Sequence, residues 1–418
     1  MGVGGTAGQT LINSGAILAS NVDDAIRDQR FNNAVYSDSG TTRILNLEAG
    51  VLAATSTEGD GIRLQGLVDG GVVINNGLVS SMRSFGVDFG GIGLDQFAVL
   101  RNFGTITGGA GAFLGSQNGD ILRNAGILDG AVLLEDGGDI FRNSGTVGDQ
   151  LFGGEGDDLV NNRHGTIDEA VFLGAGQDVL INTYGSITGL IDCGDGADTV
   201  FGNWTQAEEI IGGGGPDTVD FRFGPAVILA LDGAFASAGA ALGDQLSEIE
   251  NLAGSDSGND NLRGDALANE LSGRGGNDRL DGAAGNDNLT GGGGRDTLIG
   301  GAQEDSLQGA AGNDTFLYQG RADFLDTIFD FGTTLDDNDR FLFARSDLGG
   351  GLVAGKIALA LFRSRADNLA QDADDRFIYR TTDATLWYDE DGNGAAGPLQ
   401  VASLSFGTAL TAADIFIL

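Results

Sequence analysis

The chain has 418 residues, of which 74 are glycine and 3 are proline, and its formal net charge is −38 at pH 7. The low proline content excludes collagen and Pro-rich disorder, and a hydrophobic content of 41% is enough for a core. The acidic excess argues against nucleic acid and anionic membrane surfaces as partners, because like charges repel. With 60 acidic residues against 22 basic ones, a compact chain would also repel itself unless it bound cations.

Length and cysteine content add further bounds. A chain of 418 residues can hold two or more domains. Cys193 is the only cysteine, so no intrachain disulfide is possible. No apolar run approaches the roughly 18 residues that a membrane-spanning helix needs. The first residues, MGVGGTAGQT, have neither a basic nor an apolar stretch, so we expect no conventional N-terminal secretion signal.

Residues 1–220 repeat a short strand that ends in asparagine, as in VLRNFGTI (99–106) and ILRNAGIL (121–128). A further strand in each repeat, such as GAFLGS (111–116), lies between glycines. A period of about twenty residues with such pieces is typical of a parallel β-helix, which we expect to wind right-handed. Asparagines at a repeated corner can hydrogen-bond along the stack. The expected ladder is Asn13, Asn46, Asn76, Asn102, Asn124, Asn143, Asn162, Asn182 and Asn203.

The same repeats contain Gly-rich turns that end in aspartate, for example GGEGDDLVN (153–161). Glycine reaches the φ > 0 conformations of tight turns, and Ca²⁺ prefers six to eight oxygen ligands. Turns without metal, held by aspartate side chains, are the alternative. Calcium is less expected at 114–142, where Asp120 and Asp139 lie in turns with fewer glycines. The expected calcium residues at 153–220 are Gly154, Gly156, Asp158, Gly176, Asp178, Gly194, Gly196, Asp198, Gly213, Gly215 and Asp217.

Residues 221–254 alternate apolar residues and lack linker composition, so we interpret them as a connecting module of the solenoid. Residues 255–317 then repeat every nine residues, as in GAAGNDNLT (282–290) and GGGGRDTLI (291–299). Two such nonads should make one coil, which stacks aspartates eighteen residues apart, such as Asp278 and Asp296. The expected calcium residues here are Asp260, Asp278, Gly285, Asp287, Gly292, Gly294, Asp296, Gly301, Asp305, Gly312 and Asp314.

One nonad departs from the pattern. GDALANELS (264–272) has Leu267 in place of its second key glycine and Asn269 in place of aspartate, so calcium is not expected there. Gln303 replaces a glycine in a later nonad, which is a milder departure.

The nonads resemble the G-G-x-G-x-D-x-U-x repeat of the RTX (repeats-in-toxin) calcium-binding proteins. This resemblance implies a parallel β-roll that binds several Ca²⁺ ions. It also implies export by type I secretion machinery and a secreted or extracellular location. Residues 318–418 resemble the C-terminal region of serralysin-type proteins, and the final LTAADIFIL resembles type I secretion signals. Within this region DEDGNG (389–394) is either a calcium loop, with Asp389 and Asp391 as ligands, or a plain acidic turn.

Most enzyme chemistry is excluded by the residues that are missing. His164 is the only histidine and lies at a coil corner, so zinc-protease and Ser–His–Asp mechanisms have no basis. A β-helix with calcium does suggest a polysaccharide lyase or epimerase. Strand alternation should place Arg101, Arg123 and Arg142 in one outward ladder. This ladder is either a solvated face or a strip that binds anionic glycans.

These patterns together predict an all-β protein. A right-handed parallel β-helix (1–220) continues through a connecting module (221–254) into a calcium-binding parallel β-roll (255–317), followed by a C-terminal β-rich cap (318–418). The preferred function is a secreted calcium-binding solenoid with a structural or adhesive role, on or near a cell surface, which folds after export. Anionic glycans and other copies of the chain are its candidate partners. The alternative is a calcium-dependent polysaccharide-modifying enzyme.

Overall fold

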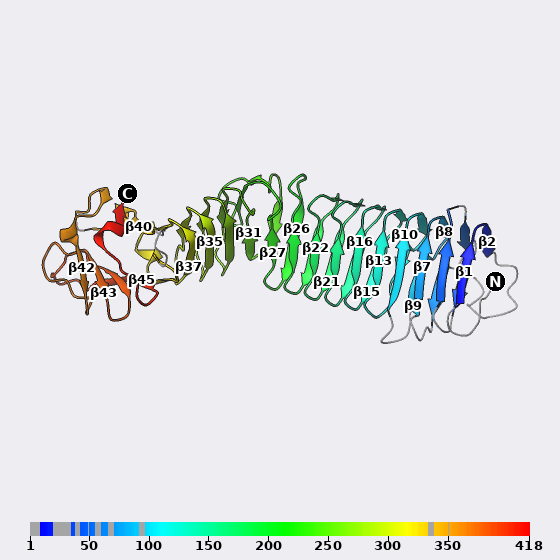
Figure 1. Ribbon diagram of the computed structural model, residues 1–418, viewed down its shortest axis with the longest axis horizontal. Coiled ribbons are helices and arrows are strands. Elements are labelled where there is room, and N and C mark those ends of the chain that lie inside the picture. Colours follow the sequence, from blue (N-terminus) through cyan, green and yellow to red (C-terminus); the bar gives the residue numbers. More distant parts are fainter. Residues whose placement is uncertain are drawn as a thin grey trace. The chain divides into compact units, whose positions relative to one another are not determined.

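The computed structural model describes residues 9–19, 35–37, 42–48, 50–54, 60–65, 71–91, 97–332, 338–349 and 351–418. These residues form strands, turns and short 3-10 helices, and the strands follow one another coil by coil (Figure 1). The chain divides into two compact units, one of residues 1–218 with 244–248 and one of residues 219–243 with 249–418. None of the helices among the described residues is long and apolar enough to span a membrane.

The first unit is a parallel β-helix with three strand positions per coil. The first position is occupied by β1 (Gln9–Asn13), β4 (Thr42–Asn46), β7 (Gly71–Asn75), β10 (Ala98–Asn102), β13 (Ile121–Asn124), β16 (Ile140–Asn143), β19 (Leu159–Asn161), β22 (Val179–Ile181) and β25 (Thr199–Phe201). The second is occupied by β2 (Ala16–Ala19), β5 (Val51–Ala54), β8 (Leu78–Ser81), β11 (Thr105–Gly108), β14 (Ile127–Asp129), β17 (Thr146–Val147), β20 (Thr166–Ile167) and β23 (Ser186–Ile187). The third is occupied by β3 (Val35–Ser37), β6 (Ile62–Gln65), β9 (Phe85–Gly91), β12 (Gly111–Leu114), β15 (Val132–Asp136), β18 (Leu151–Glu155), β21 (Val171–Ala175), β24 (Ile191–Asp195), β26 (Glu209–Gly214) and β30 (Gln245–Ser247).

The second unit is a parallel β-roll with two strand positions per coil. One ladder contains β31 (Asn251–Ala253), β33 (Glu270–Gly275), β35 (Asn288–Gly294), β37 (Ser306–Gly312) and β39 (Asp326–Ile328). The facing ladder contains β28 (Val227–Ala230), β32 (Asn261–Arg263), β34 (Arg279–Asp281), β36 (Thr297–Ile299), β38 (Thr315–Tyr318), β40 (Arg340–Phe343) and β46 (Ile415–Ile417). The unit boundary falls within β27 (Thr218–Asp220).

The β-roll does not stop at residue 317, where the nine-residue period ends. Strand β38 pairs in parallel with β40, and β40 pairs in parallel with the C-terminal β46. A hairpin forms between β43 (Phe377–Arg380) and β44 (Thr385–Tyr388), and β44 pairs with β45 (Leu399–Leu404). The remaining elements are β29 (Ala238–Gly239), β41 (Gly355–Lys356), β42 (Phe362–Arg365), η2 (Arg321–Asp323), η3 (Arg345–Asp347), η4 (Leu359–Leu361) and η5 (Ala412–Asp414).

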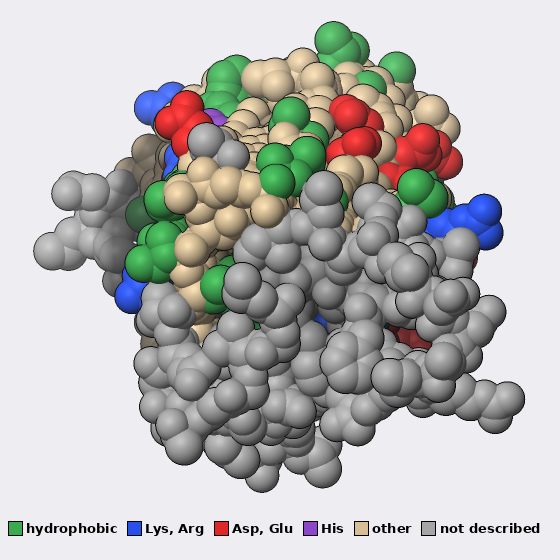
Figure 2. Space-filling view, turned by 90° about the vertical axis from the view of Figure 1, so that its right-hand side faces the viewer, with side chains coloured by type: hydrophobic (Ala, Val, Ile, Leu, Met, Phe, Trp, Pro, Cys, Tyr) green, Lys and Arg blue, Asp and Glu red, His purple; other side chains and the backbone are tan. Residues whose placement is uncertain are grey.

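The core is aliphatic along the nonads, whereas the C-terminal part of the second unit buries aromatic side chains such as Tyr318, Phe341 and Phe377. In the β-roll each nonad contributes one large apolar side chain, and each of these side chains is at most 1% exposed. Burying one such side chain contributes about 1.5–3 kcal/mol, so the core depends on many small, regular additions. These side chains are Leu262, Leu271, Leu280, Leu289, Leu298, Leu307 and Phe316. On the face drawn in Figure 2, acidic side chains gather beside exposed apolar ones.

The asparagine ladder of the first unit forms, with two corrections. The Nδ2 of each ladder asparagine donates to the Oδ1 of the next, from Asn13 through to Asn182. Asn75 occupies the place expected for Asn76, because Asn75 pairs in register with Asn46 and is followed two residues later by Gly77. The expected last member, Asn203, is also outside the ladder, since its Nδ2 donates to the carbonyl of Gly185.

Candidate calcium sites

The aspartates of the turns form three columns, in which a backbone N–H joins each residue to the carboxylate in the next coil. In the β-roll the N–H of Asp278 donates to Oδ1 of Asp296, eighteen residues later, at 2.8 Å. On the other edge the N–H of Asp287 donates to Oδ1 of Asp305, also at 2.8 Å. The stacking expected from the nine-residue period is therefore confirmed. The first unit has one column, which runs through Asp120, Asp139, Asp158, Asp178, Asp198 and Asp217.

The second carboxylate oxygen, Oδ2, has no hydrogen-bond partner in most of these residues. It is buried from water, and none of the described residues donates to it. A buried carboxylate oxygen without a donor costs free energy unless a proton or a cation binds it. This holds for Asp139, Asp158, Asp178 and Asp198 in the first unit, and for Asp278, Asp287, Asp296 and Asp305 in the second.

The electrostatics of the columns follow from that burial. Desolvation raises the pKa of Asp278 to about 7, although the hydrogen bond from Asp260 N–H lowers it and the neighbouring carboxylates raise it further. Desolvation likewise raises the pKa values of Asp158 and Asp287 to about 7. Without a cation, these carboxyl groups therefore hold protons far more readily than an aspartate in water.

The glycines of each turn bring backbone carbonyls into the same place. Gly294 and Gly312 both have positive φ, and a side chain at Gly312 would collide with the carbonyl oxygen of Gly294. The same relation holds between Gly196 and the carbonyl of Gly176 in the first unit. Stacked carbonyl oxygens beside a carboxylate column supply the hard oxygen ligands that Ca²⁺ prefers.

The first glycine of each nonad is a functional position that the sequence interpretation missed. A side chain at Gly291 would meet Oδ2 of Asp296, and one at Gly282 would meet Oδ2 of Asp287. These glycines make room for the carboxylate that the turn directs inward. Their fixed place, five residues before each aspartate, is the signal that could have identified them.

Two further aspartates also extend the columns beyond the nonads. The N–H of Asp305 donates to Oδ1 of Asp326, and the N–H of Asp314 donates to Oδ1 of Asp339. Both lack the preceding glycines, but each keeps the Asp-x-apolar spacing of the repeat, in DTI (326–328) and DRF (339–341). That spacing could have found them.

In two columns, a backbone N–H of the protein donates a hydrogen bond to the Oδ2 of the first aspartate. Oδ2 of Asp120 accepts from the N–H of Ser116 at 2.7 Å. Oδ2 of Asp260 accepts from the N–H of Ser255 at 2.8 Å, and its Oδ1 accepts from Val227 N–H at 2.6 Å. Asp260, an expected ligand, therefore differs from the aspartates that follow it.

The degenerate nonad also differs in geometry. Asp265 and Leu267 are not among the residues with positive φ, whereas Ala283 and Gly285, at the same positions one coil later, are. The Nδ2 of Asn269 donates to the carbonyl of Glu250 at 2.9 Å, so this turn is closed by protein hydrogen bonds. Whether calcium is absent from this nonad stays a prediction.

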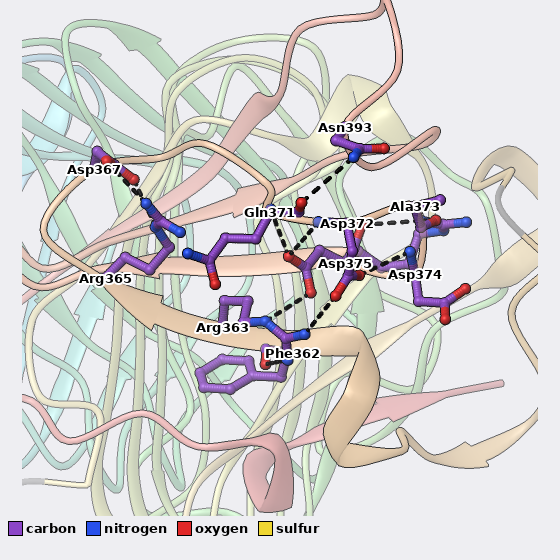
Figure 3. A network of polar contacts seen from close by, with 11 residues as sticks. Phe362, Arg363, Arg365, Asp367, Gln371, Asp372, Ala373, Asp374, Asp375 and Asn393 are labelled. Atoms are coloured by element: carbon purple, nitrogen blue, oxygen red, sulfur yellow. Dashed lines mark hydrogen bonds and ion pairs between the residues drawn. The ribbon is translucent and has the colours of Figure 1, made fainter.

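The C-terminal loop that contains Asp389 and Asp391 is held by its own hydrogen bonds. Oδ2 of Asp391 accepts from the N–H groups of Ala395 and Ala396 at 2.9 and 3.1 Å. The N–H of Asn393 donates to the carbonyl of Asp372, and Figure 3 shows Asn393 beside that neighbouring loop. Calcium at this loop stays a prediction.

The same neighbourhood contains an ion-pair network (Figure 3). Arg363 contacts the buried carboxylate of Asp375 at 2.9 Å and also pairs with Asp372. Arg363 therefore compensates part of the charge of these two carboxylates.

The columns fit Ca²⁺, because their buried carboxylate oxygens lack donors and lie beside backbone carbonyl oxygens. The described residues contain no group of three or more His, Cys, Asp or Glu side chains placed to hold a metal ion. An ion in these turns would be held by an aspartate Oδ2 and by backbone carbonyls. Bound there, Ca²⁺ would neutralise the buried carboxylates and join neighbouring turns.

Comparison with known protein families gives four matches, all to the RTX calcium-binding nonapeptide repeat. They cover residues 145–162, 255–289, 281–316 and 290–324. No curated protein matches the chain. The first match contains the turn of Asp158 in the β-helix, and the others cover the β-roll. The chain therefore carries RTX calcium-binding nonapeptide repeats, which bind Ca²⁺ at multiple sites.

Proposed function

We propose that this protein is a secreted, structural or adhesive β-solenoid whose folded state depends on Ca²⁺. The observation that carries the proposal is the series of buried Oδ2 atoms that accept no hydrogen bond, at regular intervals in both units. We assign the calcium ligands to the column aspartates, with Asp158, Asp278, Asp287 and Asp296 as the leading candidates, together with the carbonyls of their glycine turns.

Binding energy would make calcium decisive for folding. A site that binds Ca²⁺ only in the folded state adds about 2.7 kcal/mol when free calcium is 100-fold above the dissociation constant. Several such sites would exceed the 5–15 kcal/mol of net stability that is typical of a domain, on an order-of-magnitude scale. The chain would stay unfolded where calcium is scarce and fold where it is abundant.

The C-terminal tail supports export before folding. Ile415 and Ile417 of β46 are 0% and 3% exposed, and β46 pairs with β40 and β41. Type I secretion machinery that reads this tail would need it before β46 is buried. Folding driven by extracellular calcium would then follow export and hide the signal.

A calcium titration tests the proposal. The purified chain is stripped of calcium and titrated, while far-UV circular dichroism and light scattering are recorded, with magnesium as the control ion. We expect cooperative gain of β-structure with calcium and little with magnesium. Unchanged β-structure and melting temperature in excess chelator would overturn the proposal. Detection of the folded protein in the medium of the producing cells tests the location separately.

One observation favours the second function, modification of an anionic polysaccharide. The exposed His164 lines the same groove as Arg123 and Arg142, so a base and positive charges lie near each other. Release of unsaturated uronic-acid products in the presence of calcium, lost in Arg123→Ala, would support an enzyme. If no uronan tested gives a product, the structural and adhesive role remains the proposed function.

A further inference from the structure

Three arginines form an outward column on the β-helix. Arg101 of β10 pairs in register with Arg123 of β13, which pairs with Arg142 of β16. All three side chains are exposed. Neighbouring strands lie about 4.8 Å apart, so the three residues extend over about 10 Å along the stack.

This column borders a groove of about 410 Å³. Ala125 and Ser144, the residues after the ladder asparagines of their coils, line it. In the preceding coil the equivalent residue is Phe103, which is 57% exposed and also lines the groove. Small residues in two successive coils thus leave a depression beside a larger aromatic side chain.

The charges of these arginines are not compensated within the described part of the protein. None of the three makes an ion pair or hydrogen bond with a described side chain, whereas Arg63, Arg263 and Arg363 each pair with aspartates. In a chain of net charge −38, these three aligned arginines concentrate positive charge on one part of the surface. They also repel one another, and a bound anion would relieve that repulsion.

The spacing of the charges distinguishes between polyanions. Duplex DNA carries one charge per about 1.7 Å, more than twice the density of one arginine per 4.8 Å or so. The acidic remainder of the chain would repel such a dense polyanion most strongly. A polyuronate carries one carboxylate per sugar ring, and the exposed ring of Phe103 offers an apolar face to a sugar.

We propose that this groove binds an extended anionic polysaccharide, with Arg101, Arg123 and Arg142 pairing with carboxylates on successive sugars. The proposal rests on the adhesive role argued above and names its ligand. Guanidinium and carboxylate groups form paired, charge-assisted hydrogen bonds, which give both affinity and register.

The test uses the full chain in saturating calcium and a short oligogalacturonate of defined length, with binding measured by calorimetry. Arg123→Gln and Arg142→Gln should each weaken binding about tenfold, the effect of losing one charge-assisted pair. Ala125→Phe should weaken binding without changing the charge, because it fills the groove. This fold should tolerate a phenylalanine there, since Phe103 occupies the equivalent position one coil earlier.

Arg345→Gln is the matched control, because Arg345 is exposed and lies outside the groove. It should bind the oligogalacturonate as the wild type does. The proposal is overturned if Arg345→Gln weakens binding as much as Arg123→Gln, if Ala125→Phe binds normally, or if a neutral oligosaccharide of equal length binds equally well. Circular dichroism of each variant with and without calcium reports separately on calcium-dependent folding.

Discussion

The side-chain amide of Asn182 donates a 2.7 Å hydrogen bond to Oε1 of Glu208. This bond is the last step of the asparagine ladder, in which every Nδ2 points toward the next coil. A ladder of uniform direction ends on a donor and therefore needs an acceptor. Glu208 supplies one, and its other carboxyl oxygen accepts from the N–H of Asn203 at 2.7 Å.

Stability should depend on pH through Glu208. Desolvation raises its pKa from 4.5 to about 7, against the lowering effect of the hydrogen bonds from Asn203 and Asn182. The folded state thus holds the proton more tightly than the unfolded chain. The stability from this group is complete below pH 4.5 and is lost as pH rises to about 7.

Glu208→Gln removes this titration. In saturating calcium, the fall in stability between pH 4.5 and pH 8 should be smaller in the variant than in the wild type, by about 3 kcal/mol. Melting temperatures across the pH range measure the difference. Glu209→Gln, an exposed neighbour, is the control and should follow the wild type. Identical pH profiles for wild type and Glu208→Gln would show that this carboxyl does not titrate in the window.

Two adjacent glycines should respond very differently to alanine. Gly294 has φ +138°, and its Cβ would collide with the carbonyl of Gly276. Gly293 does not have positive φ, and its Cβ would meet only one atom, at 3.9 Å. Gly294→Ala should lower stability by at least about 1–3 kcal/mol, the cost of a disfavoured backbone conformation. Gly293→Ala should change the melting temperature little, and equal effects of the two would contradict the turn geometry.

The sequence predicted the residues that recur in every coil, but it did not always predict the exact position of a repeated residue. The nine-residue period stacks equivalent residues of successive coils. It therefore predicts that Leu280 and Leu289 are core positions and that Asp278 and Asp287 lie on opposite edges of the β-roll. Asn75 was misplaced by one because two asparagines are adjacent, although the Asn-x-Gly spacing around Gly104 and Gly126 distinguishes them.

Features set by tertiary contact were not predictable in this way. Glu208 follows Asn182 by 26 residues, and the ladder reaches it only through the path of an irregular coil. Asp326 and Asp339 lie outside the nine-residue period, so the period does not place them; their Asp-x-apolar spacing is a weaker signal, and strand pairing puts them on the columns. The lack of a donor to Oδ2 of Asp296 likewise depends on where every neighbouring N–H points, which the period does not specify.

Two aspartates of one column should separate calcium binding from simple structural support. Oδ2 of Asp296 has no protein donor, whereas both oxygens of Asp260 accept backbone N–H groups. Asp296→Asn should reduce the rise in melting temperature that calcium produces, because a ligand charge is lost. In calcium-free buffer it should be neutral or stabilising, since a buried charge is removed.

Asp260→Asn should lower the melting temperature with and without calcium, because an amide nitrogen cannot accept from Ser255 or Val227 N–H. The expected loss is about 1–3 kcal/mol, the cost of a buried donor left unsatisfied. Thermal melts of both variants in calcium and in chelator give the comparison. A full calcium response in Asp296→Asn would remove this carboxylate from the proposed ligands.

The degenerate nonad offers a gain-of-function prediction. Leu267 is 60% exposed, so its replacement by glycine sacrifices little apolar burial and permits the positive φ found at Gly285. Asn269→Asp restores the carboxylate and removes the amide bond to Glu250. The double variant Leu267→Gly/Asn269→Asp should bind one more Ca²⁺ than the wild type, as counted by calorimetry and by metal analysis of the dialysed protein.

The single variant Leu267→Gly is the control and should bind no additional Ca²⁺, because it supplies the turn without the charge. An unchanged calcium count in a folded double variant would mean that glycine and aspartate at these two positions are not sufficient to make a site.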